Sequence, residues 1–114
     1  MTNTKSASEL DLGADLATTR STRRLAGGGT WVLGTLHGHR FEALVFPEHA
    51  EDRTWEVDDS RISKLWIRRL ADRKPVYGWD REPDLPAADD VVGQIVEFLC
   101  AGLADHVYPE GQNA

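Results

Sequence analysis

The sequence predicts an α+β fold: an antiparallel meander of four to five strands, with one C-terminal amphipathic helix packed on one face. Short β-branched and aromatic runs recur between Thr30 and Trp79, and turn-forming residues separate them. A run with helical periodicity follows after Asp84. With 114 residues, the chain has room for a single modest core.

Residues 1–29 are rich in Ser, Thr, Ala and Gly and end in three glycines. This composition predicts a flexible N-terminal tail before a single ββββα domain at residues 30–108, with a C-terminal tail at 109–114. Ser8 to Asp11 resembles a helix capping box, and Leu12 and Leu16 follow at i,i+4 spacing. We therefore expect a transient helical turn inside the tail.

The predicted strands are Thr30–Leu36, Arg40–Phe46, the short Thr54–Val57, Arg61–Arg69 and Pro75–Trp79. The first two flank His37-Gly38-His39, and two strands separated by three residues with a glycine are typical of a hairpin. The last element is the helix, for which Asp84 is the expected cap and Pro86 suits the first turn. Its apolar face is expected to contain Val91, Val92, Ile95, Val96, Phe98, Leu99 and Leu103.

The predicted sheet is apolar on both faces. In the third long strand, alternation assigns Leu65 and Ile67 to the face under the helix. It assigns Ile62, Lys64, Trp66 and Arg68 to the other face. One helix covers one face, so a second cover is expected: the N-terminal leucines, a second copy of the chain, or a foreign partner.

Charge is distributed unevenly along the chain. The net charge is −6, and residues 82–114 contain seven acids and no lysine or arginine, whereas residues 61–74 hold six cations and one acid. The molecule should be electrically polar, which influences the choice of partner. There is no membrane-length apolar run and no apolar signal segment, so we expect a cytoplasmic protein without a membrane partner.

No catalytic, metal or cofactor site is predicted. The histidines His37, His39 and His49 are too few and too poorly spaced for a metal site. Cys100 and His106 lie about 120° apart on a helix, so they cannot form a nucleophile and base pair. The glycines at 27–29 precede a strand, whereas phosphate loops lead into a helix. We therefore expect a protein that is not an enzyme and needs no cofactor.

Three blocks of the sequence resemble a known family. They are Trp31, Gly34, Gly38 and Phe41 in the first hairpin, Arg61 to Ile67 (RISKLWI), and more loosely Tyr77 to Arg81 (YGWDR). They resemble W-x-x-G-x-x-x-G-x-x-F, R-I-S-K-L-x-I and Y-x-R-G-W-D motifs of small proteins common in phage and prophage genomes. The resemblance covers about residues 31–81 and implies a phage-type protein without an assigned reaction.

The expected function is binding by protein–protein contact, with a host or phage protein as partner. One expected surface comprises Ile62, Lys64, Trp66, Arg68 and Trp79, and the other comprises the acids Asp89, Asp90 and Glu97. The resemblance favours an inhibitor of a host defence or nucleic-acid-processing complex, similar to an anti-CRISPR protein.

Two alternatives remain open. Lys64, Trp66 and Arg68 could bind single-stranded nucleic acid by stacking and charge, although an isoelectric point of about 5.1 argues against this partner. The chain could also be a homodimer that buries its open sheet faces.

Overall fold

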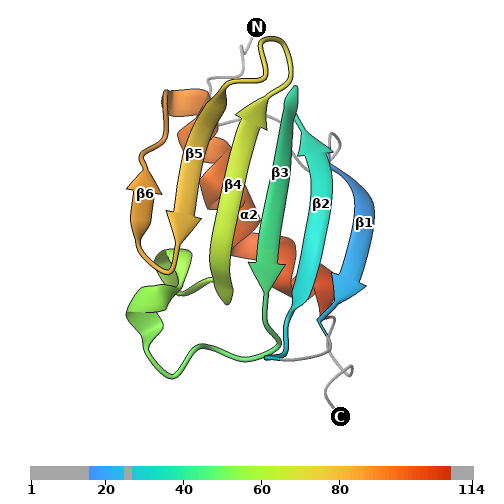
Figure 1. Ribbon diagram of the computed structural model, residues 1–114, viewed down its shortest axis with the longest axis vertical. Coiled ribbons are helices and arrows are strands. Elements are labelled where there is room, and N and C mark those ends of the chain that lie inside the picture. The colour runs from blue at the N-terminus through green and yellow to red at the C-terminus, as the bar shows by residue number, and fades with distance from the viewer. Residues whose placement is uncertain (1–15, 25–26, 109–114) are drawn as a thin grey trace, which may run out of the picture.

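The computed structural model describes residues 16–24 and 27–108, which form one sheet with a helix across one side (Figure 1). Six antiparallel strands follow each other in chain order. They are β1 (Ala17–Arg23), β2 (Thr30–Leu36), β3 (His39–Val45), β4 (Ile62–Arg69), β5 (Pro75–Asp80) and β6 (Pro83–Leu85). The helix is α2 (Asp90–Val107). The predicted α+β class and C-terminal helix are confirmed, but the number of strands was underestimated.

The N-terminal segment is one source of the difference. Ala17–Arg23 pairs with β2 as the edge strand β1, so the expected flexible tail through residue 29 is wrong for this part. All seven residues are exposed and most are polar, which is typical of an edge strand and produces no apolar pattern. Arg23 lies over the ring of Tyr108 at 5.3 Å and joins the edge to the end of α2. The expected capping box at residues 8–11 lies outside the described residues.

The start of the helix also differs from the prediction. The N-cap is Asp89, whose side chain accepts a hydrogen bond from Val92 N–H at 2.9 Å, and not Asp84. Asp84 belongs to β6, which pairs with β5 through Gly78 and Leu85. Pro86 lies in the connection between β6 and α2. Because Pro83–Leu85 pairs with β5 as the last strand of the sheet, the helix begins about one and a half turns later than predicted.

The predicted strand Thr54–Val57 is wrong. This part of the β3–β4 connection forms two short 3₁₀ turns, η2 (Arg53–Trp55) and η3 (Val57–Asp59). Asp52 caps the first turn by accepting from Thr54 N–H at 3.0 Å. The local side-chain bond therefore overrides the β propensity of Thr54 and Val57. The first hairpin also turns more tightly than expected, through His37 and Gly38 alone, both with positive φ.

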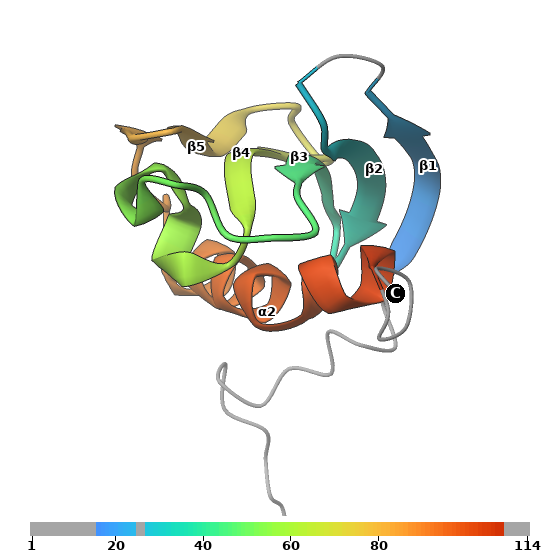
Figure 2. The same cartoon turned by 90° about the horizontal axis from the view of Figure 1, so that it is seen from below.

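Figure 2 shows α2 lying across one face of the sheet, and the buried core side chains come from these two layers. The helix contributes Val92, Ile95, Val96, Leu99, Leu103 and Ala104, and the sheet contributes Val32, Leu36, Phe41, Ala43, Val45, Ile62, Leu65, Ile67 and Val76. Leu65 and Ile67 thus lie under the helix as predicted. Tyr108 closes this layer, because its hydroxyl lies 2.6 Å from Thr30 Oγ1 at the start of β2. Within residues 16–24 and 27–108, no helix is long and apolar enough to cross a bilayer.

Gly34 is the tightest point of the sheet. It lies opposite Phe41 on β3 and Thr18 on β1, on the helix-covered face. A Cβ at this position would lie 2.7 Å from both the Ala17 carbonyl oxygen and ring atoms of Phe41. The aromatic ring and the edge strand can approach the β2 backbone only because no side chain intervenes.

Gly34→Ala should lower the free energy of unfolding by about 2 kcal/mol, because overpacked cores must shift backbone or rings. Gly102→Ala is the matched control, since this exposed helix position has no neighbouring atom within 4 Å. It should raise the free energy of unfolding by up to about 1 kcal/mol through helix propensity. Urea unfolding followed by circular dichroism measures both changes, and equal stability of the two variants would contradict the close packing at Gly34.

Candidate functional site

The sheet face opposite α2 carries rings and charges in three rows. Directly paired residues of antiparallel strands share a face, so the registers place them without ambiguity. The first row is Thr22, Trp31, Leu44, Lys64 and Asp80; the second is Arg20, Leu33, Glu42, Trp66 and Gly78; the third is Thr35, Arg40 and Arg68. We call this surface the open face.

Two tryptophans meet at the centre of the open face. The rings of Trp31 and Trp66 stack with centroids 6.2 Å apart and an interplanar angle of 16°. They project from β2 and β4, which flank β3, so the pair spans the middle strand. Leu44 of β3 lies beside Trp31 and is only 1% exposed, although no helix covers it. The two rings therefore supply part of the second cover that the apolar sheet requires.

Two arginines lie next to this pair. Arg40 and Arg68 are direct cross-strand partners, and both are exposed. Within the described part of the chain, neither guanidinium has an ion-pair or hydrogen-bond partner. Like charges directly opposite each other destabilise a sheet. An anionic group placed between the two guanidinium groups would remove this repulsion.

The structure brings together only part of the first expected surface. Lys64, Trp66 and Arg68 lie together on the open face, but Ile62 is 0% exposed in the core. A β-bulge between Leu44 and Val45 leaves Ser63 as the extra residue of β4, so alternation fails there and Ile62 pairs with Val45. The assignment of Ile62 to the uncovered face is wrong for this reason.

Trp79 was also placed on the wrong face. It pairs with Leu65, so it lies on the helix side and packs partly buried against the core. Its indole Nε1 donates to the Trp55 carbonyl oxygen at 2.8 Å. Trp79 thereby holds the β3–β4 connection to the sheet, and Gly78 is the residue of β5 that lies beside Trp66.

The second expected surface, on α2, is present in part. Asp89, Asp90 and Glu97 are all exposed. The side chain of Asp89 is already engaged, because it caps the helix. Asp105 lies further along and accepts a hydrogen bond from Arg61 Nη2 at 2.7 Å. The helix lies across the sheet face opposite Arg40 and Arg68, so its exposed acids lie on the other side of the molecule (Figure 2).

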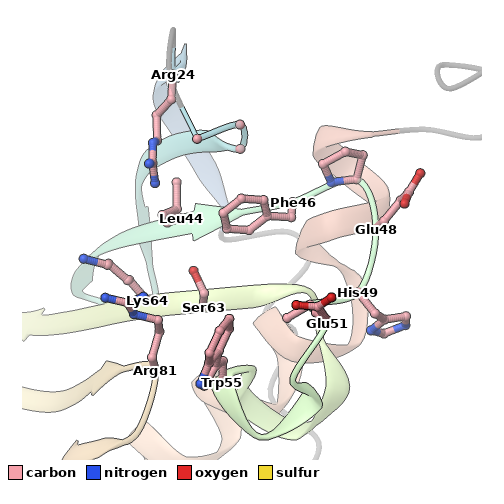
Figure 3. A pocket seen from close by; sticks show the side chains of 15 residues that line it. Arg24, Leu44, Phe46, Glu48, His49, Glu51, Trp55, Ser63, Lys64 and Arg81 are labelled. Atoms are coloured by element: carbon pink, nitrogen blue, oxygen red, sulfur yellow. The ribbon is translucent and has the colours of Figure 1, made fainter.

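A pocket that the sequence did not predict opens at one end of the open face. Its volume is about 570 Å³, and it lies between the β1–β2 and β3–β4 connections (Figure 3). The described residues that line it include Arg24, Gly29, Leu44, Phe46, Glu48, Glu51, Trp55, Ser63, Lys64 and Arg81. We call it the basic pocket because Arg24, Lys64 and Arg81 gather on one side of it. The sequence feature that could have indicated this pocket is Trp55, a large aromatic residue within an acidic loop.

Glu56 fixes the loop that forms one wall of this pocket. The residue is 4% exposed, and its carboxylate accepts from the Ala50 N–H, from His49 Nδ1 at 2.8 Å and from the Arg61 N–H at 3.0 Å. Burial by itself raises the pKa of Glu56, but the hydrogen bonds from Ala50, His49 and Arg61 outweigh it. The pKa therefore lies below its ordinary value, and the buried carboxyl is ionised at neutral pH.

The free thiol of Cys100 and the potential metal ligands are the other groups relevant to chemistry. Burial is the main cause that raises the pKa of Cys100 to about 11, so its sulfur is a protonated thiol at neutral pH and a weak nucleophile. Among the residues that the structure describes, no group of three His, Cys, Asp or Glu side chains is placed to hold a metal ion. The open face and the basic pocket are the features suited to binding.

The model of one protein family, a domain of unknown function (DUF7678), matches residues 30–104. The match begins at the first residue of β2, so β1 lies outside it, and it ends in the last turn of α2. No curated protein and no solved structure matches the chain.

Glu56→Gln should lower the free energy of unfolding at pH 7 by about 2 kcal/mol, because a neutral amide accepts these bonds less strongly and adds donors. A carboxyl whose pKa is lowered by folding stabilises the fold above its unfolded pKa, and this stabilisation is lost as pH falls through the folded pKa. The difference between wild type and Glu56→Gln should therefore shrink below about pH 4.5. Denaturant unfolding at several pH values tests this; the exposed control Glu48→Gln should stay within about 0.5 kcal/mol of wild type.

Proposed function

The chain belongs to the family described as a domain of unknown function (DUF7678), and we propose that it is a cytoplasmic, non-enzymatic binding protein whose open face holds an acidic segment of a partner protein. The observation that carries this proposal is the exposed pair Arg40 and Arg68 beside the Trp31–Trp66 stack. Arginine and tryptophan are the residue types that contribute most to protein interfaces.

Charge complementarity supports an acidic occupant. Arg20, Arg40, Lys64 and Arg68 share the open face with two acids, Glu42 and Asp80. Asp80 already pairs with Lys64 at 3.4 Å, which leaves the arginines in excess. An acidic side chain bound between Arg40 and Arg68 gains two charge-assisted contacts and removes the repulsion between them. Planar guanidinium groups also bind carboxylates in a bidentate manner.

A narrower form of the proposal concerns the partner. An inhibitor of a host defence or nucleic-acid-processing complex, encoded by a phage or other mobile element, would use the open face for one component. The exposed acids Asp90 and Glu97 on the opposite side could then occupy a basic groove of the same complex. The separation of basic and acidic surfaces on one small domain supports this form.

A double substitution, Arg40→Glu with Arg68→Glu, should abolish partner capture and leave the fold intact. Both residues are exposed, so the free energy of unfolding should fall by no more than about 1 kcal/mol, partly through repulsion between the new carboxylates and Glu42. Arg73→Glu with Lys74→Glu, in the exposed β4–β5 turn, is the matched control. Each protein is immobilised and incubated with nuclease-treated lysate, and captured proteins are identified by mass spectrometry.

The acidic segment of the captured protein is then synthesised and titrated. Binding to wild type and to the turn control, with at least tenfold weaker binding to the open-face variant, is the expected result. Equal binding to all three proteins would remove the open face from the interaction.

Single-stranded nucleic acid is the second candidate, and the stacked tryptophans favour it. Aromatic rings with neighbouring cations are the usual platform for single strands. In this case capture would disappear on nuclease treatment, and fluorescence anisotropy with labelled oligo-dT would show affinity falling steeply with salt. An affinity that is independent of salt excludes this candidate.

A symmetric dimer through the open faces is disfavoured by the same arginines, since a two-fold interface would bring four guanidinium groups together. Size-exclusion chromatography with light scattering should therefore report a mass near 12.7 kDa. A mass of twice this value that falls to the monomer in Arg40→Glu with Arg68→Glu would replace the acidic partner by a second copy of the chain.

A further inference from the structure

The β-bulge in β4 turns a polar side chain into the basic pocket. Ser63 is 7% exposed, and in the described part of the chain its hydroxyl has no hydrogen-bond partner. Figure 3 shows the hydroxyl oxygen pointing toward Leu44 and Phe46 across the cavity. Buried hydroxyl groups nearly always have a hydrogen-bond partner. The Ser63 hydroxyl is therefore available to form a hydrogen bond with a molecule bound in the pocket.

Two aromatic side chains form walls of the same cavity. Phe46 directly follows β3, and Trp55 comes from η2 on the opposite wall. Trp55 is 40% exposed, yet its backbone is held by the hydrogen bond from Trp79 Nε1. The hydrogen bond fixes the Trp55 backbone, and the Arg81 guanidinium lies over one face of the ring. The exposed part of the ring is available for contact with a planar group.

Charges divide the pocket into two sides. Arg24, Lys64 and Arg81 lie on one side, and Glu48 and Glu51 lie toward the other (Figure 3). The Arg81 guanidinium is 5.9 Å from the centre of the Trp55 ring, so cation and ring are adjacent. Arg81 also has φ of 62°, a left-handed conformation, and its N–H donates to the Ser63 carbonyl oxygen at 2.8 Å.

We propose that the basic pocket binds a mononucleotide whose base carries an amino group. The base stacks between Phe46 and Trp55, the phosphate lies against the guanidinium of Arg81, and the amino group donates to Glu51. The Ser63 hydroxyl donates to the sugar or phosphate oxygens. A volume of about 570 Å³ is in the range of small-molecule sites. The site is separate from Arg40 and Arg68, so it goes beyond the proposed partner binding.

Isothermal titration calorimetry of the full chain with AMP tests this site. We expect one saturable site, weakened about tenfold or more by Ser63→Ala and by Arg81→Gln, because each removes a polar contact to the ligand. UMP, which lacks an exocyclic amino group, should bind more weakly than AMP. Arg73→Gln, in the exposed β4–β5 turn, is the matched control and should bind AMP as wild type does. Circular dichroism confirms that each variant is folded.

Absence of saturable binding at millimolar AMP would overturn the proposal, and so would equal AMP affinity of Arg81→Gln and wild type. Equal affinity for AMP and UMP would overturn the role of Glu51. A short single strand titrated in parallel distinguishes two sources of the ligand: tighter binding that also depends on Arg81 indicates a nucleotide within a strand, and weaker binding indicates a free nucleotide. The variant Arg40→Glu with Arg68→Glu should still bind AMP, which separates this site from the partner surface.

Discussion

The β-bulge at Ser63 is the constraint on which both candidate binding features depend. One extra residue in β4 lets Ile62 enter the core while Lys64, Trp66 and Arg68 remain on the open face. Without it, the alternation of the strand would place either Ile62 in solvent or Trp66 under the helix. The same residue brings the Ser63 hydroxyl into the basic pocket, and its carbonyl oxygen accepts from Arg81. A local irregularity of the ladder thus defines the surface and the pocket together.

The open face combines a stabilising and a destabilising arrangement. The Trp31–Trp66 stack covers apolar sheet surface that no helix reaches, so these rings contribute to stability as well as to any interface. The pair Arg40 and Arg68 has the opposite effect, since no acid of the described chain neutralises it. A sheet face that holds its rings in place and leaves Arg40 and Arg68 without an ion pair supports the proposed binding of an acidic group.

Sequence reasoning succeeded where a pattern had a single physical cause. Thr30–Leu36 was predicted with the bounds that β2 has, and Leu65 and Ile67 were assigned to the helix-covered face, because buried strands alternate with period two. It failed for Ala17–Arg23, whose polar residues carry no period and pair only because β2 offers a free edge. It failed for Ile62 and Trp79 because bulges and registers are set by partner strands.

The sequence by itself determined the α+β class, the C-terminal helix and the separation of charge along the chain, since these follow from local periodicity and composition. The tertiary structure alone decided which side chains meet. It stacks Trp31 on Trp66 and places Arg40 opposite Arg68. It also forms a pocket whose lining includes Arg24, Trp55, Ser63 and Arg81. The reason is that cross-strand register and loop position depend on contacts between residues far apart in the chain, which no local pattern encodes.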